Sequence, residues 1–139
     1  MRPLTLACTL LLPFVSAGCG GDIQNFIGPT PDPVIVTETF TGTLTRNGAT
    51  SHPFSVTSAG GGEVVAVLRA VTPDDTTVVG FSLGTWNGTS CQAVLSSDRA
   101  VVLASLLGQA TSTGTLCVRI YDIGALVDPQ DYEIEVTHP

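Results

Sequence analysis

The sequence predicts an antiparallel β-sandwich of about eight strands. From residue 34 onward, apolar and polar side chains alternate with a period of two, which is typical of half-buried strands. Clusters of Gly, Asn, Asp, Ser and Pro interrupt this alternation at short, regular intervals, as turns between short strands do. Only Ala100–Leu107 is also compatible with a short helix. The length of 139 residues suits a single domain.

The first two strands are expected at residues 36–45 and 50–57. Five threonines of the first strand share one face, and its apolar residues share the other. Asn47-Gly48 follows directly and favours a tight hairpin, because a type I′ turn requires positive φ at both central residues. Pro53 has no N–H to donate, so we expect the second strand at a sheet edge or a bulge.

Six further strands are expected. They lie at residues 63–71, 77–83, 91–96, 101–108, 115–121 and 130–137. The first of these is apolar on both faces, which favours a central position in a sheet. The last two are expected to pair as a hairpin, with Arg119 opposite Glu133 and Cys117 opposite Glu135, so that the apolar residues of both strands share one buried face. Tyr132, Ile134 and Val136 lie on that face, and Glu133 and Glu135 point the other way.

Residues 1–18 predict a secretory signal peptide, with Arg2 followed by an apolar run and then by small residues. The run is shorter than the ~20 residues that a membrane span needs, and Pro13 interrupts it. Residues 19–33 hold three prolines and two aspartates without periodicity, which predicts a flexible tether before a folded domain at 34–139.

The tether has an alternative interpretation, in which it packs onto the domain through Ile23, Phe26 and Ile27.

The junction Ser16-Ala17-Gly18-Cys19 resembles the lipobox of bacterial lipoproteins, although Ser16 stands where that family usually has Leu. The resemblance implies that Cys19 is lipidated and anchors the chain to a membrane of the bacterial cell envelope. Gly20 is not the Asp that often retains lipoproteins at the inner membrane, so the outer membrane is favoured. Simple secretion is the alternative.

The other cysteines fit this location. Cys8 leaves with the signal peptide, and Cys91 and Cys117 remain as a pair in an oxidising compartment. We therefore expect a disulfide, which would stabilise the domain by roughly 3–4 kcal/mol. With only two histidines beside them, these cysteines match no zinc spacing.

Short segments within residues 36–137 resemble a known family. They are Glu38-Thr39-Phe40-Thr41-Gly42-Thr43-Leu44, Phe54-Ser55-Val56, Gly114-Thr115-Leu116-Cys117-Val118-Arg119-Ile120-Tyr121-Asp122 and Asp131-Tyr132-Glu133-Ile134-Glu135-Val136. These segments are similar to the bacterial pre-peptidase C-terminal domain, which occurs at the ends of secreted proteases and in many extracellular proteins. The resemblance implies a jelly-roll β-sandwich.

Composition and motifs argue against catalysis and against nucleic-acid binding. The net charge of −7 offers no basic face for phosphates, and the chain has no lysine for Schiff-base chemistry. Gly80-Phe81-Ser82-Leu83-Gly84 matches the G-x-S-x-G string of hydrolases, but it lies in a predicted strand without the following helix. We expect Ser82 to face solvent, and His52 and His138 to be surface residues.

Two sets of residues are candidate binding sites. Loop carboxylates could converge on calcium, or simply start turns: Asp74, Asp75, Asp98, Asp122, Asp128 and Asp131. Trp86 and Tyr121, with Asn87, could form a platform on which sugars stack, or Trp86 could cap the core.

The sequence thus predicts a non-enzymatic, lipid-anchored β-sandwich that serves as an interaction or structural module at the cell envelope and needs no cofactor. An envelope protein or a glycan is the expected partner. The alternative is a glycan- or calcium-dependent binding domain. Low surface charge and many threonines also permit self-association along an edge strand.

Overall fold

A computed structural model describes Gly28 and residues 31–139 of the chain. The predicted signal peptide, Cys8, Cys19 and most of the predicted tether, with Ile23, Phe26 and Ile27, lie outside these residues. None of the residues that the structure describes belongs to a helix that could span a membrane.

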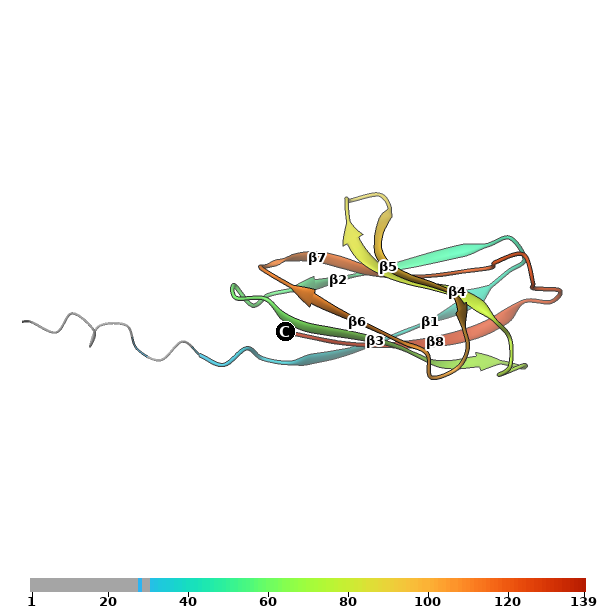
Figure 1. The fold of residues 1–139 in the computed structure, drawn as a ribbon, viewed down its shortest axis with the longest axis horizontal. Helices are drawn as coiled ribbons and strands as arrows, with labels where there is room; N and C mark the ends of the chain where they lie inside the picture. Colours follow the sequence, from blue (N-terminus) through green and yellow to red (C-terminus); the bar gives the residue numbers. More distant parts are fainter. Residues whose placement is uncertain (1–27, 29–30) are drawn as a thin grey trace, which may run out of the picture. The chain divides into compact units, whose positions relative to one another are not determined.

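Eight antiparallel strands form two four-stranded sheets (Figure 1). The strands are β1 (Val36–Leu44), β2 (Ala49–Val56), β3 (Gly62–Thr72), β4 (Val79–Trp86), β5 (Cys91–Ala100), β6 (Ser105–Ala110), β7 (Gly114–Tyr121) and β8 (Gln130–His138). We call the sheet with the order β1-β8-β3-β6 sheet A, and the sheet with the order β2-β7-β4-β5 sheet B.

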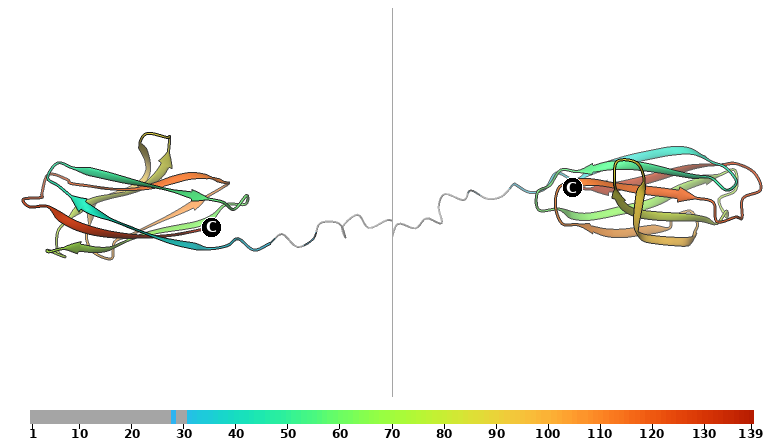
Figure 2. Two further views of the ribbon diagram at one scale, coloured as in Figure 1. Left: turned by 180° about the vertical axis from the view of Figure 1, so that it is seen from behind. Right: turned by 90° about the horizontal axis from the view of Figure 1, so that it is seen from above.

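The strand order is that of a jelly roll. Every connection crosses from one sheet to the other except the β4–β5 hairpin, which stays within sheet B. Figure 2 shows the two layers from behind and from above. The predicted β-sandwich of about eight strands is confirmed, β3 is an interior strand, and β2, with Pro53, is an edge strand.

The segment around Ala100–Leu107 contains no helix. Residues 101–104 form a turn, in which the Ala104 N–H donates to the Val101 carbonyl at 2.8 Å and Leu103 has a φ of 72°. The predicted strand at 101–108 therefore begins only at Ser105.

Both predicted hairpins are wrong in their pairing. The turn at Asn47-Gly48 forms, with the Gly48 N–H donating to the Thr45 carbonyl at 2.8 Å, but it joins β1 of sheet A to β2 of sheet B. Likewise β7 and β8 lie in different sheets, so Arg119 lies opposite Ser51 and Ser82 and not opposite Glu133.

The reason for this error is physical. Two consecutive amphipathic strands bury their apolar faces equally well side by side in one sheet or face to face across a sandwich. Their alternation pattern is the same in both arrangements. Cys117 accordingly lies opposite Pro53 and Gly84, and Glu135 lies opposite Thr39 and Val67.

The core lies between the inner faces of the two sheets. Its buried side chains come from both layers, as predicted for Tyr132, Ile134 and Val136 of β8. Among the side chains that are 0% exposed, Phe81 of β4 is the largest.

Candidate functional site

The small residues of the G-x-S-x-G string of β4 are explained by close packing against neighbouring strands, and not by a catalytic turn. Ser82 is 1% exposed and its Oγ has no hydrogen-bond partner in the described part of the chain. A Cβ on Gly80 would lie 2.1 Å from the Tyr121 ring, and a Cβ on Gly84 would lie 1.9 Å from the Gln92 carbonyl oxygen. The expectation that Ser82 faces solvent is therefore wrong, because β4 is interior in sheet B and is buried on both faces.

Tyr121 is held in place on the outer face of sheet B. Its hydroxyl donates a hydrogen bond to Asp98, and the Arg119 guanidinium carbon lies 5.1 Å from its ring centroid. The hydrogen bond to Asp98, together with burial, raises the pKa of Tyr121.

Trp86 and Tyr121 do not form a common platform. Tyr121 lies opposite Gly80, six residues along β4 from Trp86. At ~3.4 Å per residue, that separation is about 20 Å. Asn87 uses its side chain locally, where its Oδ1 accepts the N–H groups of Thr89 and Ser90 at 2.9 and 2.8 Å.

The predicted disulfide between Cys91 and Cys117 is confirmed, with Cα atoms 5.7 Å apart. It joins β5 to β7 although β4 lies between them in sheet B. The register of β4 with β5 shifts between Leu83 and Gly84, and the tip of the β4–β5 hairpin rises from the sheet (yellow in Figure 1). This bend brings Cys91 over the sheet to Cys117.

Both histidines lie between the two sheets, on the side where the edge strand β1 of sheet A faces the edge strand β2 of sheet B. His52 is half-buried: its Nε2 is 2.8 Å from the Tyr132 hydroxyl and its ring is stacked 5.0 Å from the Phe40 ring. Burial lowers the pKa of His52 and raises the pKa of Tyr132.

His138 is 2% exposed, with Nε2 2.9 Å from Glu38 Oε1 and its ring 4.9 Å from the Phe54 ring. The prediction that both histidines are surface residues is wrong. Their strands belong to different sheets, so their inward faces close one side of the sandwich.

Two of the calcium candidates, Asp74 and Asp122, accept hydrogen bonds from the backbone of turns. Asp74 Oδ1 accepts hydrogen bonds from the N–H and hydroxyl of Thr76 at 3.0 and 2.6 Å, and these bonds lower the pKa of Asp74. Asp75 and Asp128 are exposed. Among Gly28 and residues 31–139, no group of three His, Cys, Asp or Glu side chains is arranged to hold a metal ion.

Asp122 connects two loops. Its Oδ1 accepts the N–H groups of Gly124, Ala125 and Leu126, and its Oδ2 accepts the Asn47 N–H at 2.8 Å. Burial works to raise the pKa of Asp122, but these four backbone hydrogen bonds outweigh it and keep that pKa below its usual value.

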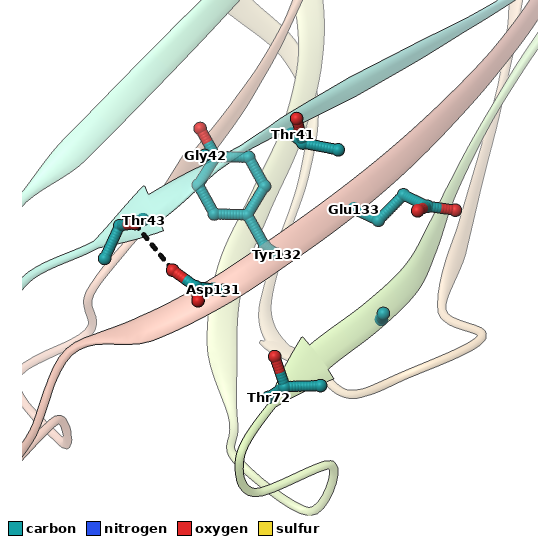
Figure 3. Close-up of a pocket in the computed structure, with 8 residues that line it drawn as sticks. Thr41, Gly42, Thr43, Thr72, Asp131, Tyr132 and Glu133 are labelled. Atoms are coloured by element: carbon teal, nitrogen blue, oxygen red, sulfur yellow. Dashed lines mark hydrogen bonds between the residues drawn. The ribbon is translucent and has the colours of Figure 1, made fainter.

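A polar groove of about 380 Å³ lies on the outer face of sheet A (Figure 3). Residues of β1, β3 and β8 line it: Thr41, Gly42, Thr43, Ala70, Thr72, Asp131, Tyr132 and Glu133. Cross-strand register places Thr41 beside Glu133 and Thr43 beside Asp131, where the Thr43 hydroxyl donates to Asp131 Oδ1 at 2.6 Å.

Sequence reasoning missed this groove, although it placed the threonines of 36–45 and the acidic residues of 130–137 each on one polar face. Only the β1–β8 pairing brings the two rows together. Glu135 continues the acidic row and forms a salt bridge with Arg69.

Comparison with solved structures shows the fold. The Yersinia pseudotuberculosis-derived mitogen superimposes with a TM-score of 0.53 at 17% identity, over 75% of this chain and 86% of that one. A chain from Bacillus endospore appendages, described as disulfide-linked pili, covers 75% of this chain and 87% of its own at 11% identity, with a TM-score of only 0.39.

No family model and no curated protein sequence matches the chain. The resemblance to the pre-peptidase C-terminal domain therefore stays a prediction.

Proposed function

We propose that this chain is a non-enzymatic binding module of the bacterial cell envelope, anchored through lipid on Cys19, with the outer face of sheet A as its binding surface. The groove between β1, β8 and β3 is the observation that carries the proposal. Its carboxylates accept hydrogen bonds, and its threonine hydroxyls both donate and accept.

The side chains most capable of catalysis are engaged in packing, which supports binding over catalysis. A serine nucleophile needs a base within hydrogen-bond reach. Ser82 Oγ has no such partner in the described residues, whereas His52 contacts Phe40 and Tyr132, and His138 contacts Glu38.

The disulfide supports an envelope location. Cys91 and Cys117 are joined, and such bonds persist in the oxidising compartments outside the cytoplasm. The lipobox-like junction supplies the anchor in this proposal. Replacing Cys19 by serine should move the protein from the membrane fraction to the soluble fraction, and an unchanged membrane fraction would refute the anchor.

The binding surface is tested by placing a photo-crosslinking amino acid at Thr72 in intact cells of the native host. Thr72 lines the groove on β3 and is exposed. The matched control is Ser55, which is exposed on β2 of sheet B. We expect a defined envelope partner, identified by mass spectrometry, at position 72 and not at 55. Identical products at both positions, or none at 72, would contradict the proposal.

A glycan is the second candidate partner, because the groove is lined by the hydroxyl and carboxylate groups that sugar hydroxyls pair with. Purified peptidoglycan fragments should then raise the melting temperature of the wild-type chain and not that of Asp131→Ala. No shift at millimolar concentrations would count against a glycan partner and leave the protein partner standing.

A further inference from the structure

We propose that β1 is the surface through which two copies of this chain associate, by antiparallel pairing of β1 with β1 of the second copy. This inference goes beyond the proposed binding function and rests on a different observation, the sheet edges that no other strand pairs with among residues 31–139.

Three of the four edge strands carry features that oppose further pairing. In β2, Pro53 is exposed and has no N–H to donate. In β5, the register with β4 shifts twice, and Asp98 and Arg99 put charges near its end. The third, β6, is only 6 residues long.

The fourth edge strand, β1, carries none of these features. It has 9 residues, and its register with β8 runs from Val36 to Leu44 without a shift. Its single charged side chain, Glu38, contacts His138. Just before β1, Val34 and Ile35 are 76% and 61% exposed. A long, regular and weakly charged edge is a template for another strand.

The partner is a second copy because β1 is complementary to itself. In a two-fold pairing centred on Phe40, residues equally far from Phe40 face each other. Thr37 then lies opposite Thr43 of the second copy, and Thr39 lies opposite Thr41. Threonine pairs of this kind stabilise neighbouring strands. The same face already holds one, between the Thr37 and Thr137 hydroxyls at 3.1 Å.

The inward face also tolerates this pairing. Glu38 would lie opposite Gly42 of the second copy and not opposite the other Glu38, so no like charges meet. The two four-stranded A sheets would continue into each other. Both polar grooves, which Thr41 and Thr43 line, would then lie on one face beside the two-fold axis, where they could bind a repetitive partner jointly.

The test introduces charged side chains at the proposed contact between the two β1 strands. Thr39→Lys/Thr41→Lys and Thr39→Glu/Thr41→Glu each place like charges opposite each other, whereas a mixture of the two variants places opposite charges together. The full mature chain, carrying Cys19→Ser so that it stays in solution, is measured by sedimentation velocity. Ser55→Lys is the control on the outer face of sheet B, and circular dichroism checks that each variant is folded.

We expect the unaltered chain and Ser55→Lys to sediment as dimers, each double variant alone as a monomer, and the equimolar mixture as a dimer again. A wild-type chain that stays monomeric, double variants that stay dimeric, or a folded mixture that stays monomeric would each overturn the proposal. None of these results depends on the crosslinks from Thr72, so this inference and the proposed function fail separately.

Discussion

Replacing Gly80 by alanine should destabilise the sandwich by about 2–4 kcal/mol, because the new Cβ would lie 2.1 Å from the Tyr121 ring. Forcing a group into a filled site costs about 1–3 kcal/mol. If the ring moves away, the hydrogen bond from Tyr121 to Asp98 is lost as well, at a cost of about 1 kcal/mol.

The assay is urea denaturation followed by the fluorescence of Trp86, the single tryptophan of the chain. Gly60→Ala is the matched control, since Gly60 is exposed and a methyl group added there would meet nothing within 4 Å. The stability of Gly60→Ala should stay within about 0.5 kcal/mol of the wild type.

A double-mutant cycle tests the contact between Gly80 and the Tyr121 ring. In a Tyr121→Ala background the space above Gly80 is free, so Gly80→Ala should cost less than about 0.5 kcal/mol there. The coupling free energy should then be about 2 kcal/mol or more. Additive effects, or a Gly80→Ala variant as stable as the wild type, would show that Tyr121 does not rest on Gly80 in solution.

Three further predictions concern stability. Removing the disulfide with Cys91→Ala/Cys117→Ala should cost roughly 3–4 kcal/mol, and reducing the wild type should lower its urea midpoint similarly; equal midpoints with and without reductant would contradict this. Because burial lowers the pKa of His52 from 6.5, the unfolded state gains its proton at a higher pH than the folded state does. Stability is therefore lost as the pH falls from 6.5 toward the lower pKa of the folded state, and the loss is complete below that pKa. The loss should be smaller in His52→Gln, and parallel pH profiles for the two proteins would refute it. Asp122→Ala should cost about 1–3 kcal/mol by leaving backbone N–H groups without an acceptor, whereas Asp128→Ala should be neutral; thermal melts that rank them equally would refute this role.

The candidate site was predictable only in pieces. The alternation of the sequence placed the threonines of β1 and the acidic residues of β8 on polar faces, but the groove depends on which strands are neighbours. The wrong pairing of β8 with β7 separated the two rows. The burial of His52 and His138 was missed for the same reason. The sequence of an alternating strand does not indicate which strand will face it across the sandwich, so it does not indicate whether a histidine on that strand is covered.

The sequence by itself determined the fold class, the approximate strand positions and the disulfide, because alternation, turn residues and cysteine number are local or countable properties. Only the tertiary structure decided that consecutive strands other than β4 and β5 lie in different sheets, that the Tyr121 ring covers Gly80, and that a groove crosses β1, β8 and β3. These features follow from contacts between residues far apart in the chain. The sequence of an amphipathic strand does not specify them, because any partner strand that buries its apolar face is compatible with its alternation of apolar and polar residues.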